Sequence, residues 1–139
     1  MENINDLKSS FSVESILLTE SNFSRKGNIK FNDSDSEVTF ETGVGSKDDT
    51  INVKLKTTVI NKYNNEEQYR IEVTMVGVFK CNGNPTPEQK DSFGRINGAA
   101  IIFPFIREHI ANIALKAGLG VVILPPVNFT KINTKENQN

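Results

Sequence analysis

The chain has 139 residues, a formal net charge of −1 and one cysteine. This length fits a single domain, and the nearly neutral charge offers no bulk attraction to nucleic acid or to an anionic membrane. One thiol excludes an intrachain disulfide framework, which makes a reducing, cytoplasmic compartment the simpler expectation.

Residues 1–10 are polar and show no periodicity, so we expect a flexible N-terminal arm there. They contain neither a basic leader nor an apolar stretch, and no secretory signal is predicted. The longest apolar run, residues 99–106, contains Pro104 and ends at Arg107, so no membrane insertion is predicted either.

The first predicted strand begins at Phe11. Apolar residues alternate there as Phe11 and Val13, and the phase then switches to Ile16 and Leu18, which is typical of a β-bulge. Residues 24–35 are rich in Ser, Asn, Asp and Gly, which indicates a long exposed crossover.

Three further strands are predicted from alternating apolar side chains in residues 37–45, 51–60 and 69–81. The connections GSKDD and YNNE have the composition of tight turns. Strands joined in this way form an antiparallel meander, whose apolar face needs a cover. The sequence therefore predicts an α+β fold, in which a four-stranded antiparallel sheet with a long first crossover packs on one long helix.

Two helical segments follow the sheet. Thr86-Pro-Glu-Gln89 has the form of a capping box with proline at the first helical position, so a short helix through Phe93 is expected. A long helix is then predicted from an apolar stripe at helical spacing, formed by Ile102, Phe105, Ile106, Ile110, Ile113 and Ala117. Pro104 leaves two alternatives: a helix that begins near Asn97 and kinks, or one that begins at Pro104. The long helix is predicted to end at Gly118.

Residues suited to catalysis are few. His109 is the single imidazole and Cys81 the single thiol, and neither a phosphate-binding loop nor a dinucleotide glycine fingerprint occurs. We interpret His109 as a packing or subunit-contact residue and Cys81 as a small buried apolar residue. No enzyme activity, metal or cofactor is predicted.

Apolar residues exceed the needs of one small core. Ile29 and Phe31 lie in the crossover, and residues 121–124 follow the long helix. Burying each large side chain contributes roughly 1.5–3 kcal/mol, so exposed ones either bind something or become an aggregation liability. By this argument alone they could equally close on their own sheet and helix.

The segment GAAIIFPFIREHIANIALKAGLGVVILPPVNF, residues 98–129, resembles the C-terminal half of the SecB family of ATP-independent protein-export chaperones. The residues that carry the resemblance are Phe103, Pro104, Arg107, Glu108, Leu124, Pro126, Val127, Asn128 and Phe129. Weaker matches lie at Phe11-x-Val13-x-x-Ile16, at Glu37-Val38 and at Gly77-x-Phe79. The resemblance covers residues 11–129 as one SecB-like domain. Residues 130–139 are expected to form a flexible polar tail, where long members of the family continue into a second helix.

The resemblance implies a cytoplasmic holdase that binds unfolded polypeptide clients and forms a homotetramer, as a dimer of dimers. The residues expected to bind clients are Phe23, Ile29, Phe31, Val121, Val122, Ile123, Leu124, Val127 and Phe129. The residues expected at the oligomer interface are Phe11, Val13, Ile16, Leu18, Arg107, Glu108, His109, Asn112 and Lys116.

Family members dedicated to export carry an acidic outer sheet face that meets a basic motor ATPase. Here the predicted outer face is balanced, with three acidic and four basic residues: Glu37, Glu41, Glu72, Lys54, Lys56, Arg70 and Lys80. Such a face should steer a basic partner poorly. Chaperones that protect an antitoxin resemble this chain equally well. Two alternatives stay open from other classes: a small-ligand domain without chaperone activity, and an assembly protein whose apolar patches are permanent interfaces.

Overall fold

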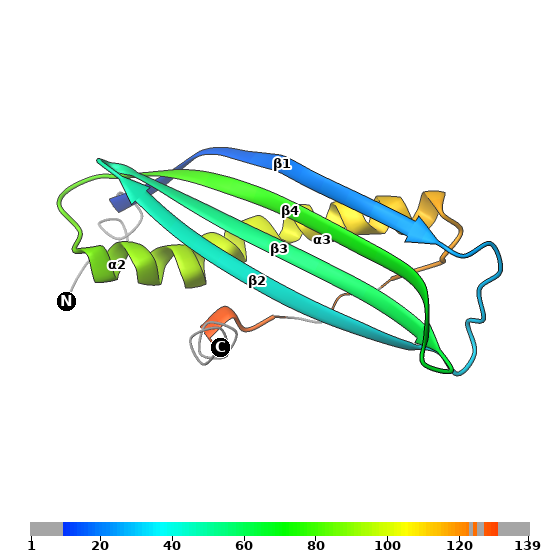
Figure 1. Ribbon diagram of the computed structural model, residues 1–139. Coiled ribbons are helices and arrows are strands. Elements are labelled where there is room, and N and C mark those ends of the chain that lie inside the picture. Colours follow the sequence, from blue (N-terminus) through cyan, green and yellow to red (C-terminus); the bar gives the residue numbers. More distant parts are fainter. Residues whose placement is uncertain (1–9, 123, 125–126, 131–139) are drawn as a thin grey trace.

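A computed structural model describes residues 10–122, 124 and 127–130. Four long strands form one antiparallel sheet in the order β1-β4-β3-β2. The strands are β1 (Phe11–Arg25), β2 (Asp35–Lys47), β3 (Thr50–Tyr63) and β4 (Glu66–Cys81). Figure 1 shows the helical segments along one face of this sheet. The predicted arm at residues 1–9 and the predicted tail beyond Thr130 lie outside the described residues.

Both predicted hairpins are confirmed. The turn between β3 and β4 places Asn64 and Asn65 at φ values of 52° and 63°, and asparagine is among the residues that tolerate this left-handed region best. The other hairpin turns at Asp48, with φ 56°. The crossover from β1 to β2 passes the ends of β4 and β3 and carries the chain from one edge of the sheet to the other (Figure 1).

Alternation in β3 and β4 produces the predicted buried face. Inward side chains of both strands form the core, namely Ile51, Val53, Leu55, Val59, Tyr69, Ile71, Val73, Met75, Phe79 and Cys81. The predicted bulge in β1 is also confirmed, because the pairing with β4 shifts between Val13 and Ser15 and again between Leu18 and Glu20. A shift of this kind changes which residues of the strand beyond it face the core.

The helical region is longer than either alternative predicted. The capping box at Thr86 is present and opens α2 (Pro87–Ser92). A π-helical segment, η1 (Phe93–Gly98), leads directly into α3 (Ala99–Lys116). Pro104 is therefore inside a helix and not at its start, which corrects that alternative. Pro104 has no amide hydrogen to donate to the Ala100 carbonyl, and both residues lie on the exposed side of α3.

The buried stripe of α3 also differs from the prediction. Phe105, expected to be buried, is 49% exposed, while Phe103 and Ala114 are buried. The stripe faces β4 and β3 through Ile102, Ile106 and Ile110 as expected. The stretch Pro87–Lys116 is long and apolar enough to cross a membrane by length and composition, but its buried side packs on the sheet, as a core helix does.

Candidate functional site

Three aromatic rings meet where α3, β2 and the C-terminal segment converge. The Phe40 ring lies 5.6 Å from the Phe103 ring and 6.0 Å from the Phe129 ring, and Phe103 and Phe129 are 5.9 Å apart, all edge to face. Such pairs add stability beyond the area they bury. The Arg107 guanidinium carbon lies 5.8 Å from the centre of the Phe103 ring. The cluster therefore joins an apolar patch to a cation at its rim.

The segment after α3 contributes both buried and open side chains. Gly118 ends the helix at φ 69°, as predicted, and Gly120 has φ 74°. Beyond them Val121 is 85% exposed, whereas Leu124 and Phe129 are buried in the core. Val122 and Val127 are half-buried against it, and the predicted client-binding residue Ile123 lies outside the described residues. Of the described residues predicted to bind clients in this segment, Val121 is the most accessible.

The crossover presents a second apolar group. Ile29 is half-buried against the core, while Phe31 is 57% exposed and Phe23, near the end of β1, is 37% exposed. Ile29 therefore anchors the loop and leaves Phe31 open. The start of the crossover lies near the end of α3. The Arg25 guanidinium joins the two, because it donates to the Ala117 carbonyl as well as to the carbonyls of Lys26 and Gly27.

A further set of large apolar side chains is exposed on β1 and α3. We call this set the β1–α3 apolar surface, and its members are Val13, Leu17, Leu18, Ile101, Phe105 and Leu115. Leu17 and Leu18 are consecutive in β1, so the set includes both faces of this edge strand. Val13 and Leu18 were predicted at an oligomer interface, whereas the other four were missed. The run Ile16-Leu17-Leu18 was a usable signal, because one face of a strand accepts only alternate residues.

The other residues predicted at an interface have contacts within their own chain. Phe11 stacks on Phe93 at 3.9 Å, and Ile16 packs partly on the core. His109 lies on the β1 side of α3, with Nε2 2.9 Å from the Ser21 hydroxyl. Asn112 donates to the Glu108 carboxylate along the exposed side of α3, where Lys116 is also exposed. Arg107 belongs instead to the aromatic cluster, which the sequence did not indicate.

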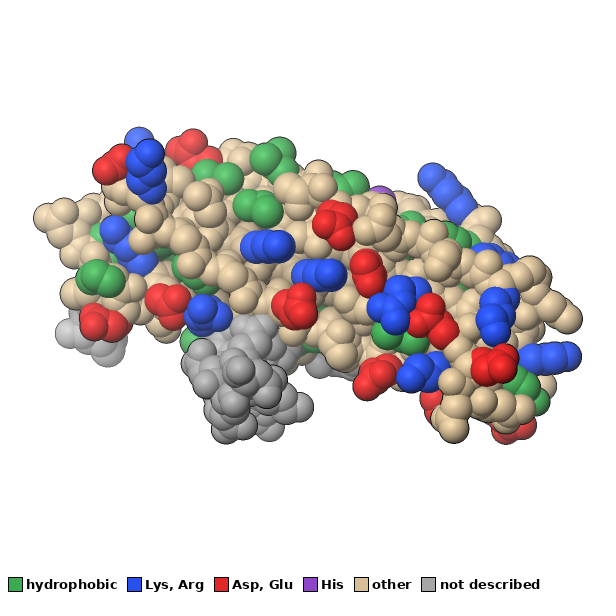
Figure 2. Space-filling view, viewed as in Figure 1, with side chains coloured by type: hydrophobic (Ala, Val, Ile, Leu, Met, Phe, Trp, Pro, Cys, Tyr) green, Lys and Arg blue, Asp and Glu red, His purple; other side chains and the backbone are tan. Residues whose placement is uncertain are grey.

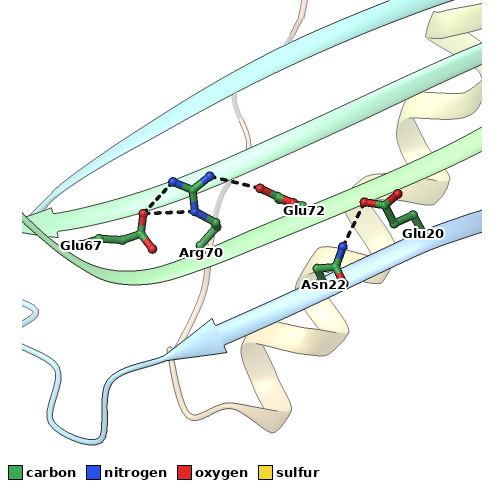
Figure 3. A network of polar contacts seen from close by, with 5 residues as sticks. All are labelled: Glu20, Asn22, Glu67, Arg70 and Glu72. Atoms are coloured by element: carbon green, nitrogen blue, oxygen red, sulfur yellow. Dashed lines mark hydrogen bonds and ion pairs between the residues drawn. The ribbon is translucent and has the colours of Figure 1, made fainter.

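The outer face of the sheet carries mixed charge, as predicted. Figure 2 shows Lys and Arg interspersed with Asp and Glu over the strands. Arg70 donates to Glu67 at 2.8 Å and to Glu72 at 3.1 Å, and nearby on β1 Asn22 donates to Glu20 (Figure 3). Hydrogen bonding from Arg70 lowers the pKa of Glu67, and these carboxylates raise the pKa of Arg70. One guanidinium thus offsets part of the charge of these two carboxylates.

Few features suggest small-molecule chemistry. Within the described part of the chain, no three His, Cys, Asp or Glu side chains gather in a group that could hold a metal ion. Cys81 is buried and its thiol donates to the Asp49 carbonyl at 3.1 Å. An open hollow of about 460 Å³ is lined by Phe11, Glu88, Gln89, Ser92, Phe93 and Asn97. The Asp91 carboxylate in α2 is paired with Arg95 at 3.1 Å.

Comparison with known proteins agrees with this architecture. Of the curated relatives, the protein-export protein SecB of Thiobacillus denitrificans is 28% identical over 91 residues, which are 66% of this chain and 59% of that protein. SecB of Thioalkalivibrio sulfidiphilus is 34% identical over 87 residues, or 60% of this chain and 49% of the relative. This chain therefore matches only about half to three-fifths of their length. For SecB of Neisseria meningitidis serogroup A, the identity is 31% over 106 residues, or 73% of this chain and 71% of the relative.

A solved structure shows the same fold. The SecB-like chaperone of Mycobacterium tuberculosis, in complex with an antitoxin peptide, has a TM-score of 0.78 to this chain at 15% sequence identity, over 88% of this chain and 94% of that one. The family model described as preprotein translocase subunit SecB matches residues 8–139. Since that match covers almost the whole sequence, the chain belongs to the SecB family.

Proposed function

We propose that this protein is a cytoplasmic, ATP-independent holdase that binds unfolded polypeptides on apolar side chains beside its sheet. The observation that carries the proposal is the exposure of Phe31 and Val121, at 57% and 85%, on a domain that already has a closed core. Exposed apolar side chains that gather in a patch mark a surface that a partner covers. Membership of the SecB family supports an unfolded chain as that partner.

The proposed binding is weak at each site and strong in total. Phe31 and Val121, with Phe23 and the half-buried Val122 and Val127, offer small separate contacts. If several subunits present such contacts to one extended client, the avidity gain is on the order of 10²–10⁴. We therefore propose a homotetramer, with the β1–α3 apolar surface as the interface that forms it. Clients should then be long and unfolded.

Two settings fit such a holdase. One is delivery of preproteins to an export motor, and the other is protection of an antitoxin. Arg70 offsets part of the negative charge of Glu67 and Glu72, and a balanced face steers a basic motor poorly. The SecB-like chaperone of M. tuberculosis has an antitoxin peptide bound. We propose the holdase activity for both settings. Of the two, we favour protection of an antitoxin over delivery to an export motor.

An aggregation assay tests this function. A chemically unfolded protein diluted into buffer should stay soluble when this protein is present at equal concentration without ATP, as followed by light scattering. Phe31→Asp and Val121→Asp should each weaken the suppression, because a carboxylate in an apolar contact must be desolvated. Asn52→Asp, on the exposed outer face of β3, adds the same charge away from these side chains and is the control.

Two results would contradict the proposal. If the wild-type protein leaves aggregation unchanged, the domain is not a holdase, and the open hollow beside Asn97 becomes the first place to search for a small ligand. If Phe31→Asp and Val121→Asp together suppress aggregation as well as Asn52→Asp does, clients bind elsewhere.

A further inference from the structure

A β-bulge in β4 turns one polar side chain toward the crossover. Asn61 of β3 pairs with Tyr69, but the next residue, Lys62, pairs with Glu67, so Gln68 is the extra residue of the bulge. Gln68 and Tyr69 are consequently both buried, although neighbours in a regular strand face opposite sides. The bulge thus places an amide under the crossover loop, which runs from residue 26 to residue 34.

Gln68 holds the middle of that loop by both ends of its amide. Its Oε1 accepts from the Lys30 backbone N–H at 2.7 Å, and its Nε2 donates to the Lys30 carbonyl at 2.9 Å. The side chain therefore pairs with Lys30 as a neighbouring strand would. The Gln68 backbone carbonyl also accepts from the Lys26 N–H at 2.9 Å. Lys30 lies directly between Ile29 and Phe31.

Asn61 extends this hydrogen-bond network to the end of the loop. Gln68 Nε2 donates to Asn61 Oδ1 at 2.7 Å, and Asn61 Nδ2 donates to the hydroxyls of Ser34 and Ser36 at 3.2 and 3.0 Å. The Ser34 hydroxyl in turn donates to the Phe31 carbonyl at 3.0 Å. Both protons of each amide have an acceptor, and Gln68 and Asn61 are each only 5% exposed. A buried network satisfied in this way specifies one geometry, because any rearrangement leaves a buried polar group without a partner.

We propose that Gln68 and Asn61 are positioning residues for client binding: they hold the crossover so that Ile29 stays on the core and Phe31 stays open to solvent. This inference rests on the proposed holdase function. Its physical basis is that the crossover loop is preorganised for client binding. A loop already fixed in its binding geometry loses less conformational entropy when a client docks, and a Phe31 side chain on a loose loop would fold back onto the apolar surface beneath it.

The test combines a binding measurement with a double-mutant cycle. Gln68→Met keeps the size of the side chain and removes its three hydrogen bonds, and Phe31→Ala removes the presented ring. The probe is reduced, carboxymethylated α-lactalbumin, a permanently unfolded chain, titrated by fluorescence anisotropy. Ile106→Val, on the buried side of α3, is the control for a loss of stability that leaves the crossover unchanged. Light scattering checks that every variant keeps the wild-type mass.

Gln68→Met should weaken client binding about tenfold, because the loop loses hydrogen bonds that hold its binding geometry and apparent affinity falls with the population of that geometry. The substitution should also speed amide hydrogen exchange at residues 26–34. Ile106→Val should change neither quantity. With Phe31→Ala already present, Gln68→Met should have little further effect on binding, because the effects of residues that act through one hydrogen-bond network are not additive.

The possible outcomes separate this inference from the proposed function. If the wild-type protein binds the unfolded chain and Gln68→Met binds equally well, the positioning role is overturned while the holdase stands. If the fold-losses in client affinity from the two substitutions multiply in the double variant, Gln68 does not act through Phe31. The inference is then also overturned. If the wild-type protein fails to bind at all, the holdase proposal falls and the positioning role falls with it.

Discussion

Gly98 of η1 lies directly against Val53 of β3: a Cβ at position 98 would stand 2.9 Å from Cγ2 of Val53. Carbon atoms prefer a separation of about 3.5–4.0 Å, so the helix meets the sheet with no room for a methyl group. We expect Gly98→Ala to lower the free energy of unfolding by about 1–2 kcal/mol, because overpacking outweighs the gain in helix propensity. Urea denaturation measures this.

Gly45→Ala is the matched control for that substitution, since a Cβ there meets nothing within 4 Å. It should leave the free energy of unfolding within about 0.5 kcal/mol of the wild-type value. A Gly98→Ala variant as stable as the wild-type protein would show that the contact between η1 and β3 can relax.

Thr57 offers a stabilising substitution. Its side chain is fully buried among apolar neighbours on β3, and its hydroxyl has no hydrogen-bond partner within the described residues. Thr57→Val replaces the hydroxyl by a methyl group of similar size, which should raise the free energy of unfolding by about 1–3 kcal/mol. Thermal denaturation checks the direction, with Thr58→Val on the half-exposed opposite face as the control. A lower melting temperature for Thr57→Val would mean that the hydroxyl has a partner in solution.

The Glu67–Arg70 pair predicts a pH dependence. Hydrogen bonding from Arg70 lowers the pKa of Glu67 below its ordinary value of 4.5. The folded state therefore favours the carboxylate, so the pair contributes stability above that value and loses it as the pH falls through the lowered pKa. Glu67→Gln should flatten the acid limb of the stability curve below about pH 5. Glu14→Gln, on the exposed part of β1, should not change that limb.

The pair lies at the surface, with both side chains more than one-third exposed. Salt should therefore reduce the difference between Glu67→Gln and the wild-type protein. Denaturation curves at low and high ionic strength test this, and an equal difference at both would argue against an electrostatic origin.

The β1–α3 apolar surface predicts the effect of charge on assembly. Phe105 is 49% exposed on α3 and Leu17 is 52% exposed on β1. Phe105→Asp and Leu17→Asp should shift the protein to smaller species at micromolar concentration, because an interface core does not accept an unpaired carboxylate. Light scattering coupled to size exclusion reports the mass, with Asn52→Asp as the control. A wild-type protein that is already monomeric would end the tetramer proposal.

Much of the sheet could be predicted from the chain itself. Ile51, Val53 and Leu55 alternate with polar residues and are all buried, and the asparagine pair at Asn64 and Asn65 marks its turn without help from distant residues. Alternation and turn chemistry are local properties, so a short window carries them. The family could be recognised for a similar reason, because the segment from Gly98 to Phe129 keeps a characteristic order of residues.

The candidate site could be predicted only in part. Phe31 and Val121 were expected to be accessible and are exposed, but Leu124 and Phe129, expected beside them, are buried. Helical spacing placed Phe105 in the core and left Phe103 out. A helical wheel locates the apolar residues but not the direction from which the sheet approaches, and the rings of Phe40 and Phe129 favour Phe103.

The sequence by itself determined the class of fold, the strand and turn pattern, and the excess of apolar side chains, because each depends on neighbours along the chain. Only the tertiary structure decided which of those side chains stay open and how the crossover is held. Lys30 and Gln68 are 38 positions apart, and their pairing depends on a bulge whose register is set by β3 and β4 together. Long-range contacts of this kind leave no periodic signal in the sequence.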